Sequence, residues 1–380
     1  MFIKIFNVKT IGVFRNIVVG SLCIMLLSCN AERCSFLAKD VHFFSNFPEV
    51  DTVTFNKLFE HQYSNIDRLI LKDSLLITQN NNGRSRKGYQ FTTYNLSTFE
   101  YCSFFPFGKG PCEILGVFGC GFLDDRFWIN DLTGRKFLSV KLKDIIPGKS
   151  EHKENCVSLS LNKGNAATLG DGFLVNDTTY ICKLVNSKSR NKLAKVKLPS
   201  CEIIKEYGVF NHDYDNEMFL LNREAHMDRS IVFIKPDDNN IMAIAYCLTD
   251  QFEVFDLENN ESNVFWGPHK IKNEFVVNKN TLRPYPQIND KTQLTYVAGY
   301  ATEKYLYLIY SGIYFKKNLT PDGASLGSKS IYVFDWTGKP IKKIVWREDI
   351  PLRAIAISEK ENVLYGYDEY SNYIVTAKLK

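Results

Sequence analysis

Short apolar segments separated by turn residues recur along the whole chain. Residues 66–72 (IDRLILK) and 75–79 (LLITQ) flank the dipeptide Asp73-Ser74, and a third apolar segment at 91–96 (FTTYNL) follows a polar loop. Short segments rich in β-branched and aromatic residues, bounded by turn residues, are typical of β-strands. Helical periodicity is nearly absent from the chain. The pattern therefore predicts an all-β fold.

This three-strand unit occurs six times, and a fourth apolar segment follows four of the units. The units lie at residues 66–96, 116–142, 165–186, 230–257, 296–336 and 353–379, and the fourth segments lie at 99–105, 192–198, 262–266 and 341–346. Four antiparallel strands repeated six times predict an all-β, six-bladed β-propeller, because closure of the ring protects most sheet edges. A two-sheet sandwich would contain far fewer strands.

The spacing of the units predicts the boundaries of the ring. Two intervals exceed the roughly 40–45 residues of one blade, which predicts insertions near residues 200–228 and 267–294. The last unit ends after its third strand, so we expect a strand within residues 50–59 (VDTVTFNKLF) to complete the sixth blade. The predicted propeller covers residues 49–380, and a tether without fixed structure covers residues 29–48.

The first 28 residues have the pattern of an export signal. Lys4, Lys9 and Arg15 precede an uncharged apolar run that ends at Cys29. The run is shorter than the roughly 20 residues that span a bilayer, and it suits a secretory signal. Its ending, LLSC, resembles a bacterial lipobox. We therefore predict a signal over residues 1–28 and lipid attachment at Cys29, which would hold the protein at the cell envelope, on the outer membrane.

Composition narrows the class of partner. The net charge of +5, with 23% charged residues, is mild, so no nucleic-acid partner is predicted. No C-x-x-C motif occurs, which argues against zinc and thioredoxin-like sites. Beyond the N-terminal cysteines at positions 23, 29 and 34, Cys102, Cys112 and Cys120 form the only close group. A local disulfide within this group is one hypothesis, and burial of several cysteines as small apolar side chains is the other.

The segment 105–116 (FPFGKGPCEILG) raises the question of a phosphate-binding loop. Such a loop needs G-x-x-x-x-G-K-[ST] leading into a helix, so that backbone N–H groups face the phosphate. Here Pro111 removes a backbone donor, and predicted strands lie on both sides. The segment is therefore predicted to be a corner between the first and second blades, which can also line a pocket.

The same loop carries a family resemblance. A lipobox, a G-x-G-P-x-E loop after the first blade and six degenerate strand units together resemble the TolB-like six-bladed propeller lipoproteins of Bacteroidota. Gly108, Gly110, Pro111 and Glu113 match the family's G-x-G-P-G-E loop, whereas Cys112 replaces its last glycine. The resemblance implies a propeller fold and an envelope location, and the family has no established reaction. The replacement implies that position 112 does not need a positive φ.

One face of the predicted ring gathers basic loops. In a propeller, the loops between second and third strands and the loops between blades emerge on the same face. The candidate ligand-binding residues on these loops are Arg84, Arg86, Lys109, Arg135 and Lys136. Cations brought together from three loops favour an anionic ligand such as a carboxylate, a phosphate or an acidic sugar. The alternative is that these side chains only solvate the loops.

Residues suited to metal binding or catalysis are sparse. Asp67 and Asn165 are the only oxygen-bearing candidates at the starts of innermost strands, and calcium needs about six to eight oxygens. An acidic pattern over residues 213–224 has Met218 where a calcium loop requires glycine. The six histidines lie mostly in loops, and no G-x-S-x-G motif or sialidase box occurs. The sequence predicts no metal, cofactor or catalytic residue.

These observations favour a membrane-anchored envelope lipoprotein whose propeller binds or scaffolds a protein partner or an anionic small ligand. One alternative is a hydrolase or lyase with an axial pocket, which requires titratable groups that converge in that pocket. A second alternative is a structural lipoprotein packed against a membrane complex, which requires an exposed apolar patch. The lining of the axial pocket separates the first two possibilities.

Overall fold

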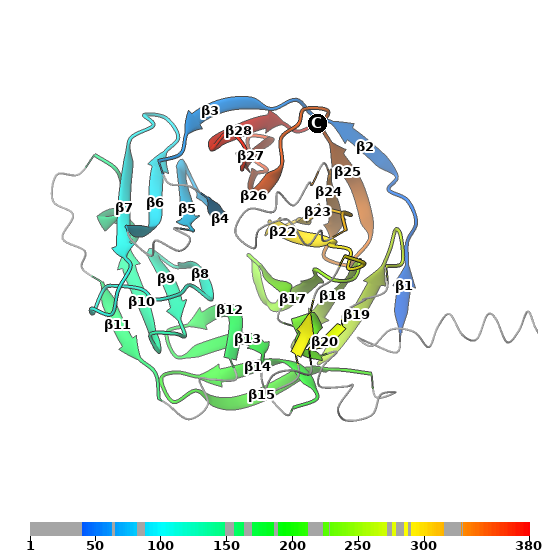
Figure 1. The fold of residues 1–380 in the computed structure, drawn as a ribbon. Helices are drawn as coiled ribbons and strands as arrows, with labels where there is room; N and C mark the ends of the chain where they lie inside the picture. Colours follow the sequence, from blue (N-terminus) through cyan, green and yellow to red (C-terminus); the bar gives the residue numbers. More distant parts are fainter. Residues whose placement is uncertain are drawn as a thin grey trace, which may run out of the picture.

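The apolar segments form sheets arranged around a central axis, as Figure 1 shows for the computed structural model of the chain. The structure describes residues 40–62, 65–81, 88–148, 156–162, 169–185, 189–211, 223–227, 229–271, 276–278, 285–287, 290–314, 328 and 330–380. These residues form six blades, each with four antiparallel strands. The predicted six-bladed propeller is confirmed.

The blades follow one another along the chain. Blade 1 contains β4 (Ile66–Lys72), β5 (Leu75–Asn80), β6 (Tyr89–Asn95) and β7 (Tyr101–Pro106). Blade 2 contains β8 (Gly119–Leu123), β9 (Arg126–Asp131), β10 (Lys136–Lys141) and β11 (Val157–Ser160). Blade 3 contains β12 (Leu169–Asn176), β13 (Thr179–Leu184), β14 (Asn191–Lys197) and β15 (Glu202–Val209). Blade 4 contains β16 (Ser230–Lys235), β17 (Asp238–Tyr246), β18 (Gln251–Asp256) and β19 (Glu261–Trp266). Blade 5 contains β22 (Tyr296–Ala301), β23 (Tyr305–Tyr310), β24 (Ser330–Asp335) and β25 (Pro340–Val345). Blade 6 contains β26 (Leu352–Ser358), β27 (Val363–Asp368), β28 (Tyr373–Lys378) and β3 (Asn56–Glu60). Outside the blades lie the hairpin β20 (Val276–Asn278) and β21 (Tyr285–Gln287), the 3-10 helix η2 (Leu142–Asp144) and a helical segment at 223–227.

Turn chemistry accounts for the inner hairpins of the first two blades. Asp73 and Asp124 have φ values of 53° and 55°, a backbone region that aspartate tolerates better than most residues. Each stands at the tight turn between the first and second strands of its blade. The innermost strands β4 and β8 therefore end, and their partners begin, where the sequence predicts.

Blade 3 differs from the prediction by one strand. Gly170-Asp171-Gly172 is not a turn but part of β12, at an irregularity where the register with β13 shifts. The turn lies instead after Asn176, so the segments predicted as second, third and fourth strands are first, second and third. The fourth strand is β15, which occupies residues predicted as an insertion. Glycine in a strand marks a bulge as readily as a turn, which explains the error.

The N-terminal segment wraps around three blades, along the outer edge of the ring in Figure 1. β3 pairs antiparallel with β28 and completes blade 6, so the predicted closure is confirmed. β2 (Glu49–Thr52) pairs in parallel with β25 of blade 5, and β1 (Val41–Phe43) pairs in parallel with β19 of blade 4. The expectation of no fixed structure up to residue 48 is therefore wrong for β1. Backbone pairing with β19, far along the chain, holds this strand, and the sequence around residues 41–43 does not indicate that pairing.

Buried polar contacts lock the joint where the ring closes. The backbone N–H of His61 donates to the Asn372 carbonyl at 2.9 Å, and the side-chain amide of Asn372 donates to the His61 carbonyl at 2.8 Å. The Nδ1 atom of His61 lies 2.8 Å from the Tyr94 hydroxyl of blade 1. His61 is 1% exposed. His61, which directly follows β3, therefore connects blade 6 to blade 1.

Candidate functional site

A cavity of about 710 Å³ runs along the axis of the ring. Residues of β4, β8, β12, β16, β22 and β26, the innermost strands of all six blades, line it. Of these strands, β4, β8, β12, β22 and β26 are labelled around the centre of Figure 1. Innermost strands run in the same direction in every blade, so their first residues share one face of the ring, here called the upper face. A concave site of this volume is large enough for a small molecule.

Bulges place charged residues at the upper end of the cavity. The register of the innermost strand shifts between Ile66 and Arg68 in blade 1, between Leu169 and Gly172 in blade 3 and between Leu352 and Ala354 in blade 6. The residues at these bulges include Asp67, Asp171 and Arg353. Bulges often redirect side chains near functional sites, because the extra residue bends the strand. Three separate blades therefore contribute charges to one end of the axis.

Arg68, Asp171 and Lys183 form the first charged group. The Arg68 guanidinium and the Lys183 ammonium each lie 3.6 Å from Asp171 Oδ2. Lys183 Nζ also donates to the carbonyls of Met227 at 3.0 Å and Ser230 at 2.8 Å. Lys183 is thus fixed by three acceptors and is buried. It supports the position of Asp171 from behind the cavity wall.

Arg353 forms the second charged group. It donates to Asp67 Oδ1 at 2.8 Å and to Glu369 Oε1 at 2.7 Å. Asp67 also accepts a hydrogen bond from Asn81 at 3.2 Å. These contacts connect the closing blade 6 to blade 1. Both partners of Arg353 are carboxylates at hydrogen-bonding distance, so this group is internally satisfied.

Arg68 differs from the other cations because all its contacts are long. Besides Asp171 at 3.6 Å, its guanidinium lies 3.5 Å from the Phe118 carbonyl and 3.8 Å from Cys120 Sγ. Charge-assisted hydrogen bonds of guanidinium groups are normally about 2.7–2.9 Å long. The side chain of Arg68 is 36% exposed. Its guanidinium is therefore better able to bind an added anion than the cations of Lys183 and Arg353, which have short hydrogen bonds.

Cys120 lies beside Arg68 but is not an activated thiol. Burial raises the pKa of the Cys120 thiol, and the nearby Arg68 guanidinium lowers it by less. The thiol therefore stays protonated at neutral pH, whereas a nucleophilic cysteine needs a lowered pKa. In the part of the chain that the structure describes, no group of three His, Cys, Asp or Glu residues could hold a metal ion.

The family-like loop between blades 1 and 2 is held by its own side chains. Glu113 accepts a hydrogen bond from the backbone N–H of Gly110 at 2.6 Å. A Cβ atom on Gly108 would lie 2.0 Å from Glu113 Oε2, so this position must be glycine for the carboxylate to fold over the loop. Asp131, fully buried, accepts from the backbone N–H groups of Leu115, Gly116 and Gly134. The loop is the predicted corner.

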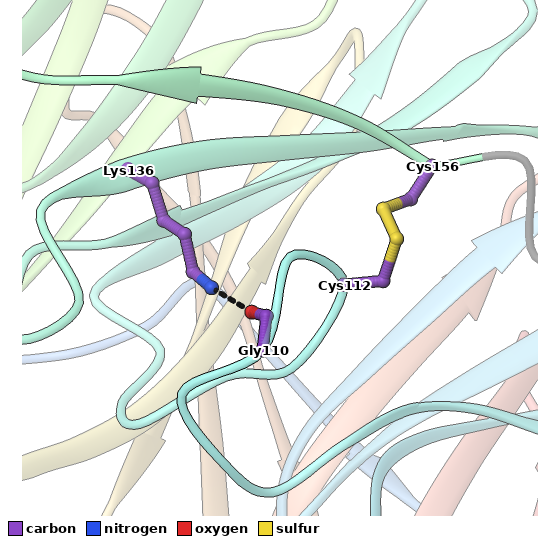
Figure 2. Close-up of a disulfide and its surroundings, with 4 residues drawn as sticks. All are labelled: Gly110, Cys112, Lys136 and Cys156. Carbon is purple, nitrogen blue, oxygen red and sulfur yellow. Dashed lines mark hydrogen bonds between the residues drawn. A yellow bond between two sulfur atoms is a disulfide. The ribbon is translucent and has the colours of Figure 1, made fainter.

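Figure 2 shows two further braces on this loop. Lys136 Nζ donates to the Gly110 carbonyl at 2.7 Å, and Cys112 forms a disulfide with Cys156, directly before β11. The hypothesis of a bridge within Cys102, Cys112 and Cys120 is wrong, because the loop points Cys112 towards blade 2 while Cys102 and Cys120 are buried free thiols. The prediction of buried cysteines is confirmed for these two. Cys112 does not have a positive φ, as the sequence implies.

The basic residues predicted from sequence have different positions. Lys109 and Arg135 are exposed on loops of the upper face, whereas Lys136 is buried and supports the loop at Gly110. The remaining candidates and the acidic pattern lie outside the described residues; these are Arg84, Arg86, Asn165, residues 213–222 and Cys29. The structure thus brings the Lys136 side chain into contact with the loop that carries Lys109.

Sequence reasoning missed Arg68, Asp171, Lys183 and Arg353. The available signal was a charged residue at the start of a predicted innermost strand, which was used for Asp67 alone. Asp171 was hidden because its flanking glycines suggested a turn.

No helix in the described part of the chain has the length and apolarity needed to cross a membrane.

A family model and a solved structure agree with this architecture. A family model described as TolB-like 6-blade propeller-like matches residues 44–360. A crystal structure of a DUF4221 family member from Bacteroides vulgatus is 12% identical, covers 86% of this chain and 96% of its own, and has a TM-score of 0.51. The Swd1 β-propeller domain from Myceliophteria thermophila is 8% identical, covers 86% of this chain and all of its own, and has a TM-score of 0.44. No curated protein matches the sequence.

Proposed function

Because the chain belongs to the TolB-like six-bladed propeller family, we propose that it is a binding module whose axial cavity holds a small anionic ligand. The observation that carries this proposal is the Arg68 guanidinium, which is partly exposed in the cavity and has only long contacts. A carboxylate or phosphate oxygen at Arg68 would replace these contacts with short charge-assisted hydrogen bonds. A propeller suits this role because rigid strands position the ligand-binding groups.

The cavity favours binding over hydrolysis or elimination. A hydrolase or lyase needs a base or nucleophile aimed at the substrate. Asp67 is bonded to Arg353, and Asp171 is paired with Arg68 and Lys183. Because Cys120 is a protonated thiol, none of these described groups is in the state that such chemistry requires. The ion pairs instead make a polar wall that can orient a ligand.

Substitution of Arg68 by methionine tests the ligand site. We expect the variant to bind inorganic phosphate or butanoate at least about 10-fold more weakly than the unchanged protein, because a hydrogen bond to a charged group contributes about 1.5–3 kcal/mol. Isothermal titration calorimetry measures the change. Arg347→Met removes the same charge from an exposed loop of the upper face and is the matched control.

A second variant separates the cavity from the rim. Lys109 is exposed on the corner loop, so Lys109→Met removes a cation from the surface without changing the cavity. Loss of anion binding in Lys109→Met, with retained binding in Arg68→Met, would place the ligand on the basic loops and overturn the axial site. If neither the unchanged protein nor the variants bind phosphate or butanoate, the proposed function is wrong.

We propose further that the module is anchored to the outer membrane through lipid on Cys29. The support is the sequence pattern, in which basic residues and a short apolar run precede LLSC. Cys29→Ser is expected to move the protein from the detergent-soluble membrane fraction to the soluble fraction, because acyl chains contribute about 0.8 kcal/mol per buried methylene. Fractionation followed by mass spectrometry of the N-terminus measures this. A variant that stays in the membrane fraction after residues 1–28 have been removed, with its binding intact, would contradict the anchor alone.

A further inference from the structure

The middle of the axial cavity is apolar although its ends are charged. Arg68, Ile70 and Lys72 lie at alternate positions of β4, Cys120 and Phe122 lie at alternate positions of β8, and Asp124 lies in the turn after β8. Side chains at alternate positions point to the same side of a strand. All six residues line the cavity. β4 therefore presents a cation, a large apolar side chain and a second cation in order from the upper face. β8 presents a thiol and then a large apolar side chain, and Asp124 in the turn that follows adds a charge at the lower end.

The opposite wall continues the apolar zone. Phe173, Ile231 and Val297 come from β12, β16 and β22 and also line the cavity. None of them is fully buried in the structure, and neither are Ile70 and Phe122. Half-buried apolar side chains around one cavity retain surface whose removal from water is favourable. An apolar ligand body would remove that surface from water.

We propose that the ligand is an amphipathic acid, with its anionic group at Arg68 and an apolar body against Ile70 and Phe122. This inference rests on the proposed function and specifies its ligand class. The strand rise of about 3.3 Å per residue separates Arg68 from Lys72 by about 13 Å along β4, which limits the length of the apolar body. The Lys72 ammonium lies 5.7 Å from the centre of the Phe122 ring, so the charged lower end directly follows the apolar zone.

A homologous series of linear carboxylates tests the ligand class. Butanoate, hexanoate, octanoate and decanoate are titrated into the full protein by calorimetry, below their micelle concentrations, beside the alcohol of matching length. We expect affinity to rise about three- to fourfold for each added methylene, until the body reaches Lys72 and the gain stops. Octanol is expected to bind at least about 10-fold more weakly than octanoate, because it lacks the charge at Arg68.

Matched variants connect this gain to the cavity wall. Ile70→Thr keeps a β-branched side chain in β4 and is expected to reduce the gain per methylene while butanoate binding stays the same. Val157→Thr also replaces a β-branched apolar side chain by threonine, on the exposed strand β11, where Val157 is 63% exposed, and is expected to change neither. The melting temperature of each variant, measured in parallel, shows that the ring is folded.

The outcomes separate the two proposals. If all chain lengths bind with equal affinity and Arg68→Met still weakens them, the anion site stands and the amphipathic ligand is wrong. If no carboxylate and no phosphate binds, both proposals are wrong. If octanol binds as tightly as octanoate, the cavity accepts apolar molecules without a role for Arg68, and the orientation proposed here is overturned.

Discussion

A chain that begins at Gln62 is expected to lose at least about 5 kcal/mol of its free energy of unfolding. Truncation removes β3, so β28 loses the ladder in which Ile374 faces Phe59 and Val375 faces Lys57. It also removes the buried side chains of Val53 and Phe55. Deletion of a buried phenylalanine side chain alone costs about 3–5 kcal/mol. Since whole domains are stable by about 5–15 kcal/mol, the truncated ring is expected to be largely unfolded at 37 °C.

Urea denaturation followed by tyrosine and tryptophan fluorescence measures this loss. A chain that begins at Asp40 retains the three N-terminal strands and is the matched control, with an unchanged midpoint expected. A chain that begins at Glu49 lacks only β1 and is expected to be intermediate. If the chain beginning at Gln62 has the midpoint and slope of the control, β3 does not close the ring.

Acidification is expected to weaken the closing joint through His61. Burial lowers the pKa of His61 to about 4, and a hydrogen bond with Asn80 raises it by less. The unfolded chain has a histidine pKa near 6.5, so between these values the unfolded state binds the proton and the folded state does not. The stability contributed by neutral His61 is therefore complete at pH 7 and is lost as the pH falls from about 6.5 to 4. The loss is about 3 kcal/mol.

Carboxylates also titrate in this pH interval. The contribution of His61 is therefore measured as the difference in pH dependence between the unchanged protein and a His61 variant. His61→Gln cannot take up the proton, so its free energy of unfolding is expected to fall about 3 kcal/mol less than that of the unchanged protein between pH 7 and pH 4. His42→Gln replaces an exposed histidine on β1 and is the control. Parallel pH dependence for the unchanged protein and His61→Gln would show that His61 does not remain neutral in the folded ring.

The fold was predictable wherever strands and turns are decided locally. The hairpin around Asp73 needs only apolar strands and a residue that tolerates a positive φ. The closing strand followed from counting strands in the last blade. β1 and β2 were not predictable, because they are short, and their parallel partners are in β19 and β25, far along the chain. Such pairing leaves no periodic pattern in the N-terminal residues themselves.

The axial site was harder to predict than the fold. Asp171 lies at a bulge between two glycines, and a bulge and a turn share that composition. Arg68 and Asp171 come together only because blades 1 and 3 meet at the axis on either side of blade 2. Lys136 was predicted to face a ligand, but the close approach of Gly110 gives it an internal partner. Each of these positions depends on contacts between separate segments of the chain, which local sequence does not encode.

The N-terminal position of the closing strand also determines when folding can finish. Val41 pairs with Val264, Glu49 with Lys342, and Asn56 with Thr376. A chain is synthesised from its N-terminus, so these three strands emerge long before their partners exist. Pairings between distant residues are slow to form. The ring therefore remains an open arc until β28 has been made, so blade 6 is the last blade that can be completed.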